Sequence, residues 1–135
     1  MTAPKSPPGV AYLRAAAINR RSAADPRSDP AATALFATAF ALLVRRRFGP
    51  GGPVGDITRT ADAASRRQPP GVLPLLEAEM LMRDALGEAV PVADIPPDTV
   101  VTAHVLLFAA LADELALADH EIDEVLATAG FARTK

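Results

Sequence analysis

Residues 31–48, AATALFATAFALLVRRRF, decide the fold of this chain. Apolar side chains cover almost the whole circumference of a helix drawn through this stretch, up to the three arginines at its end. Asp29 and Pro30 precede it as an N-cap and first-turn pair, and Gly49 follows it, where glycine commonly ends a helix. The stretch therefore predicts a buried helix.

A second stretch, TVVTAHVLLFAALADELALA at 99–118, has the same character. Asp98 precedes it as an N-cap, and Asp113 and Glu114 are its only charged residues. A helix that is apolar on nearly every side has to be covered on every side. We therefore expect this helix to be the central one.

Four further helices are predicted from apolar spacing and capping residues, over 10–24, 56–66, 74–90 and 119–129. Gly130 is expected to stop the last of them. In the helix over 74–90, Glu79 and Arg83 are spaced to form an ion pair one turn apart. The same helix is expected to bury five apolar side chains, those of Leu75, Leu76, Met82, Ala85 and Leu86.

The composition supports an all-α fold. Of 135 residues 29 are alanine, and half are apolar but only 4% aromatic, so strong helix formers supply most of the core. The length fits one domain. We expect a single compact bundle of five to six helices with two nearly all-apolar central helices, formed by residues 10–135 and preceded by a disordered, proline-rich arm at 1–9.

The net charge of −2 hides a division along the chain. Residues 1–67 hold eleven cations and four acids, a net charge of +7, whereas residues 68–135 hold three cations and twelve acids, a net charge of −9. Such a division fits a basic surface that meets an anionic partner, or two halves that attract each other within a monomer or across an oligomer. We favour attraction between the halves, because abundant arginine is also typical of GC-rich bacterial coding sequences.

No catalytic residue, metal ligand set or cofactor is predicted. The chain has no cysteine, no G-x-S-x-G elbow, no Glu-x-x-His or His-Glu-x-x-His pattern, and its GPGGPVG segment at 49–55 lacks the lysine ending of a phosphate loop. His104 has no acidic residue one turn away and is expected to be a buried, neutral histidine. Thr102 and His104 are the only polar candidates for a site inside the bundle.

The expected location is the cytoplasm. The sequence lacks cysteine, which fits a reducing compartment, and no apolar segment follows the first residues as in a secretory signal. The longest uncharged apolar stretches, 30–44 and 99–112, are too short to cross a bilayer, so no membrane partner is expected.

The predicted function is a non-catalytic protein–protein interaction module, an adaptor or regulator that associates with itself, as a dimer, or with another protein. The two helices that are apolar on all sides have more apolar surface than the four other predicted helices can bury, which favours self-association. The alternative is that one of the two apolar helices lies at the centre of a monomeric bundle. The expected apolar contacts are Phe36, Phe40, Leu43, Leu107, Phe108 and Leu111.

The alternative is a DNA-binding transcriptional regulator that uses the arginine-rich first half. Six arginines could converge on one face and neutralise phosphates: Arg45, Arg46, Arg47, Arg59, Arg66 and Arg67. The helix over 56–66 would read the bases, although the loop before it is longer than a helix-turn-helix allows. Solvated arginines on an exposed face explain the same pattern without nucleic acid.

Overall fold

The structure is a computed structural model, and it describes residues 30–49 and 54–133. The helix expected over 10–24 and the arm expected at 1–9 lie outside the described residues. Five α-helices and one short 3-10 helix are described: α2 (Pro30–Phe48), α3 (Val54–Arg66), α4 (Leu75–Ala85), η1 (Val92–Asp94), α5 (Pro97–Glu114) and α6 (Asp119–Arg133). There is no strand in these ranges, so the all-α prediction is confirmed.

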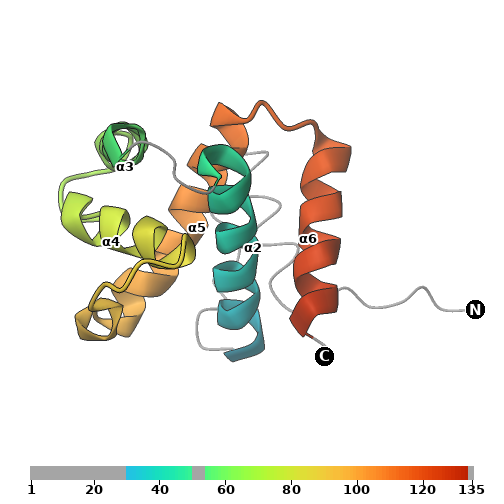
Figure 1. Cartoon of the computed structure of the whole chain (residues 1–135), viewed down its shortest axis with the longest axis horizontal. Helices are drawn as coiled ribbons and strands as arrows, with labels where there is room; N and C mark the ends of the chain where they lie inside the picture. Colours follow the sequence, from blue (N-terminus) through green and yellow to red (C-terminus); the bar gives the residue numbers. More distant parts are fainter. Residues whose placement is uncertain (1–29, 50–53, 134–135) are drawn as a thin grey trace, which may run out of the picture.

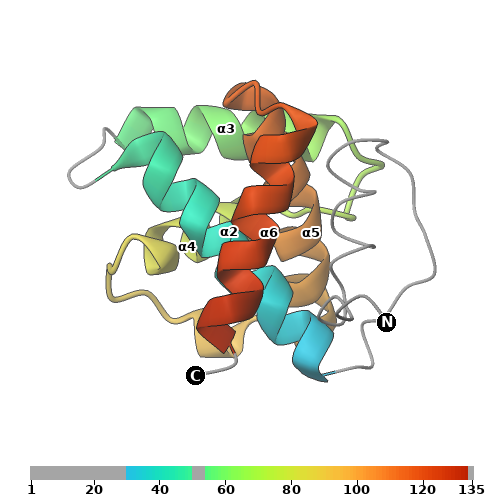
Figure 2. The same cartoon turned by 90° about the vertical axis from the view of Figure 1, so that its right-hand side faces the viewer.

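The helices lie on two sides of a central pair. Helix α2 packs against α5, and α6 packs on α2 on one side of this pair. Helices α3 and α4 pack on each other and on α5 on the other side, away from α6 (Figure 1). Figure 2 shows α6 crossing in front of α2 and α5.

Helix α2 is buried over most of its length, as its apolar sequence predicts. No residue from Ala32 to Val44 is exposed, and the first exposed side chains are those of Arg45 and Arg46. Cations at the end of a helix also interact favourably with the carbonyl end of its dipole. The boundaries predicted for this helix agree with the structure to within one residue at the start.

Helix α4 ends five residues earlier than predicted. Gly87 adopts a φ of +93°, its N–H donates to the Asp84 carbonyl, and the Glu88 N–H donates to the Arg83 carbonyl. These two hydrogen bonds form a Schellman motif, which ends the helix at a left-handed residue. A glycine takes that conformation without strain.

Helix α5 also ends early, and here no glycine marks the end. The Ala116 N–H donates to the Asp113 carbonyl and the Leu117 N–H to the Ala112 carbonyl, so the same motif forms with alanine at the left-handed position, φ 53°. Helix α6 then runs to Arg133, past the buried Gly130 that was expected to stop it.

Candidate functional site

The six apolar residues predicted to contact a partner lie in the core of the chain. All six have 2% or less of their surface exposed: Phe36, Phe40, Leu43, Leu107, Phe108 and Leu111. They belong to α2 and α5, which pack against each other at the centre of the molecule. Their apolar surface is thus covered within the chain.

Three arginines of the basic half pair with acids of the acidic half. Arg46 lies 3.5 Å from Glu121, Arg47 lies 3.1 Å from Glu114, and the Arg67 guanidinium lies 3.3 Å from an Asp113 oxygen. These ion pairs join α2 to α6, α2 to α5, and the end of α3 to α5. The two halves therefore attract each other within one chain.

The remaining three predicted phosphate contacts are also engaged. Arg59 pairs with Asp56 at 2.7 Å and Arg66 with Asp62 at 3.0 Å, both within α3. The Arg45 Nε donates to the Ala85 carbonyl oxygen at 3.1 Å. Five of the six arginines thus have a carboxylate beside them, which reduces the positive field that attracts phosphates.

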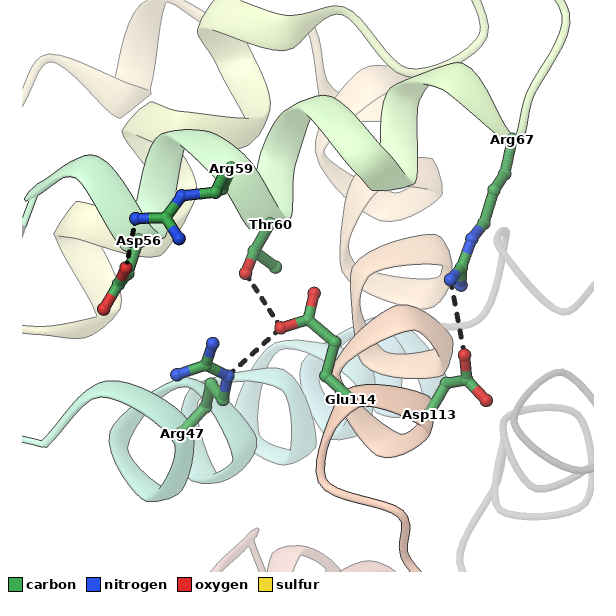
Figure 3. Close-up of polar contacts among 7 residues, drawn as sticks. All are labelled: Arg47, Asp56, Arg59, Thr60, Arg67, Asp113 and Glu114. Atoms are coloured by element: carbon green, nitrogen blue, oxygen red, sulfur yellow. Dashed lines mark hydrogen bonds and ion pairs between the residues drawn. The ribbon is translucent and has the colours of Figure 1, made fainter.

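The most connected of these acids is Glu114, at the end of α5. Its Oε1 atom accepts hydrogen bonds from Arg47 Nε, at 3.1 Å, and from the hydroxyl of Thr60, at 3.0 Å. Thr60 is buried, with 3% of its surface exposed. Figure 3 shows Glu114 between α2 and α3, with Asp113 beside it facing Arg67. One carboxylate thus joins three helices.

The position of these two acids has an electrostatic cost. Asp113 and Glu114 lie in the last turn of α5, where the carbonyl end of the helix dipole disfavours negative charge. Arg67 and Arg47 offset that cost by supplying the opposite charge from neighbouring helices. The arrangement can hold helices together.

His104 is buried in α5, with 9% of its surface exposed, and its ring lies 4.9 Å from the ring of Phe40. Burial lowers the pKa of His104 from 6.5 to about 4, because a charged imidazole loses its hydration inside the protein. The prediction that His104 is buried is confirmed, and the lowered pKa agrees with a neutral ring. Within 30–49 and 54–133, no three or more histidine or acidic side chains lie together as a metal site requires.

Three large apolar side chains near the start of α4 are exposed, which the sequence did not predict: Val72, Leu75 and Leu76, called here the exposed apolar cluster. Their exposed fractions are 38%, 38% and 64%. The prediction that Leu75 and Leu76 are buried was wrong. The buried side chains of α4 are those of Ala78, Leu81, Met82 and Ala85, and their three- and four-residue spacing places Leu76 on the opposite side of the helix.

The turn before α4 sets this orientation. The Ser65 hydroxyl donates to the Leu73 carbonyl oxygen at 2.7 Å, and the Leu73 side chain is buried. Gly71 adopts a φ of +85° two residues earlier, and the Val72 N–H donates to the Pro69 carbonyl. With Leu73 turned into the core, its neighbour Val72 is left on the surface beside the start of α4.

No model of a known protein family, no curated protein and no solved structure matches this chain. Among the described residues, no helix combines the length and apolar character that crossing a membrane requires.

Proposed function

We propose that this chain is a non-catalytic protein–protein interaction module that associates with itself, acting as an adaptor or regulator. The observation that carries the proposal is the exposed apolar cluster of Val72, Leu75 and Leu76. Three large apolar side chains exposed within five residues favour contact with another protein, whereas single exposed apolar residues are ordinary.

The cluster differs from the rest of the described surface. Within the described ranges, no large apolar side chain outside the cluster is as exposed as its three members. They lie in the turn before α4 and in its first turn. Burying such side chains against a partner stabilises an assembly by roughly 25 cal/mol per Å² of apolar surface.

The arginines give the DNA-binding alternative less support. Five of its six proposed contact residues lie beside carboxylates of the same chain. A phosphate would have to compete with those carboxylates for each guanidinium. We further propose the cytoplasm as the location, which a sequence without cysteine supports.

The test is the molar mass of the full chain in solution, measured by light scattering after size-exclusion chromatography, with absorbance recorded at 260 and 280 nm. The proposal predicts an assembly larger than one chain and free of nucleic acid. With one tyrosine and no tryptophan, the protein absorbs so weakly that bound nucleic acid would dominate the spectrum.

The matched variants are Leu76→Ser and Ala127→Ser. Leu76→Ser should reduce the mass of the assembly, because it removes the most exposed apolar side chain of the cluster. Ala127 is exposed on α6, on the far side of the molecule, so its substitution should leave the mass unchanged. A nuclease-sensitive complex would favour DNA binding instead, and a monomer at every concentration would contradict self-association.

A further inference from the structure

The outer side of α4 lies opposite the side that the core covers. Ala78, Leu81, Met82 and Ala85 face the core. A helix turns by about 100° per residue, so the side opposite these four holds Leu76, Met80 and Arg83, spaced by four and three residues. Leu76 is exposed, Arg83 is partly exposed, and Met80 is partly buried against the core. Figure 1 shows α4 at the edge of the molecule.

Arg83 differs from every other arginine whose side chain is described. Its Nε atom is buried without a hydrogen-bond partner, and no ion pair or hydrogen bond of Arg83 is found in the described part of the chain. The other six each pair with an acid or donate to a backbone carbonyl. A buried donor that lacks an acceptor destabilises the chain. The side chain as a whole is partly exposed, so its positive charge remains open to a carboxylate from outside.

Glu79 lies one turn before Arg83 and flanks the same outer side. The ion pair predicted between the two does not form: within the described ranges Glu79 has no ion pair either. The outer side of α4 thus presents, in order along the helix, the apolar Leu76, an unpaired acid and an unpaired base.

This order is self-complementary, and we propose that a second copy of the chain docks here through antiparallel pairing of two α4 helices. The inference rests on the proposed self-association and assigns its surface. With a two-fold axis near residue 81, Glu79 faces Arg83 of the second copy, and Arg83 faces Glu79 of the second copy. The same axis sets Leu76, at the start of α4, against the far end of the second copy's α4.

The charges exclude the parallel arrangement, in which the two copies of Arg83 would face each other. A second copy supplies an acid and a base at matching positions. Helix α4 has 11 residues and is about 16 Å long, so the contact is short. Stable complexes bury about 800 Å² per partner, so we expect a dimer that forms only at high protein concentration.

Charge reversal tests this pairing, with the dimer dissociation constant of the full chain measured by sedimentation equilibrium. Arg83→Glu and Glu79→Arg should each weaken the dimer about tenfold or more, because each sets like charges against each other. The double variant, Glu79→Arg with Arg83→Glu, should restore the affinity, because the pair reforms with its charges exchanged. The control is Arg59→Glu, the same charge change at an exposed position on α3, and should leave the dimer intact.

A second measurement does not depend on these charges. The chain has no cysteine, so Met80→Cys introduces a single thiol close to the proposed two-fold axis. Mild oxidation should link two chains of this variant through a disulfide, whereas Ala127→Cys should remain a monomer on denaturing gels. Circular dichroism checks that each variant is folded.

The outcomes separate this inference from the function on which it rests. A dimer that persists in Arg83→Glu and Glu79→Arg, or a double variant without restored affinity, would overturn the α4 pairing while leaving self-association in place. A wild-type chain that stays monomeric at every concentration would overturn both.

Discussion

Glu114 shows how one side chain can determine the contacts between helices. Its carboxylate accepts from Arg47 of α2 and from Thr60 of α3 while it belongs to α5. The sequence marked Glu114 and Asp113 as the two charged residues of an otherwise apolar helix. It could not show their partners, because the arginines are 46 and 67 positions away and meet them only in the folded chain.

Removing the Thr60 hydroxyl should weaken the packing of α3. Thr60→Val keeps the shape of the side chain and removes the hydrogen bond to Glu114, so we expect a loss of about 1 kcal/mol in the free energy of unfolding, measured by urea titration. Thr128→Val is the matched control, because that exposed hydroxyl bonds only a carbonyl of its own helix. Equal effects of the two substitutions would show that the Glu114 junction contributes nothing.

His104 should make stability depend on pH. Burial lowers its pKa from 6.5 to about 4, so the unfolded chain binds the proton more tightly than the folded chain. The contribution of neutral His104 to the free energy of unfolding is complete above pH 6.5. It is lost as the pH falls towards 4, by about 3 kcal/mol in total. His104→Asn should therefore lose less stability than the wild type between pH 7 and pH 4, as followed by urea unfolding at each pH. If the wild type and His104→Asn lost equal stability between pH 7 and pH 4, the buried His104 would not be the cause of the pH dependence.

At the scale of elements, the sequence predicted the helices that depend on local pattern. Helix α2 begins and ends within a residue of its prediction because proline, three arginines and glycine mark its ends. The prediction for α4 was wrong at its end because Gly87, inside the apolar pattern, takes the left-handed conformation. The end of α5 has no comparable signal, because an alanine occupies the left-handed position.

Glycine at that position should stabilise the protein. In the left-handed conformation the Cβ atom of Ala116 is crowded by the backbone. Glycine has no Cβ atom and adopts this conformation without that strain. After allowing for the greater freedom of glycine in the unfolded chain, we expect Ala116→Gly to raise the free energy of unfolding by about 0.5 to 1 kcal/mol. Ala127→Gly, inside α6, should lower it by about as much, and thermal melting distinguishes the two signs. Destabilisation by both would show that the Ala116 conformation carries no strain.

At the scale of the whole molecule, the charge division along the chain holds its parts together. Among the described residues, the basic first half and the acidic second half meet through three ion pairs, which agrees with the favoured interpretation of the composition. The apolar residues predicted as contacts are used in the core. What is left for a partner is the cluster of Val72, Leu75 and Leu76, and the unpaired charges of α4. Periodicity within α4 could have identified Leu76, because it lies opposite the residues that face the core.

Self-association is the central claim, and the molar mass of the wild-type chain at sedimentation equilibrium, over a wide range of protein concentration, tests it most directly. We predict a mass that rises with concentration from 14.1 kDa, the mass of one chain, towards twice that value. A mass that stays at 14.1 kDa over the whole range would contradict the claim.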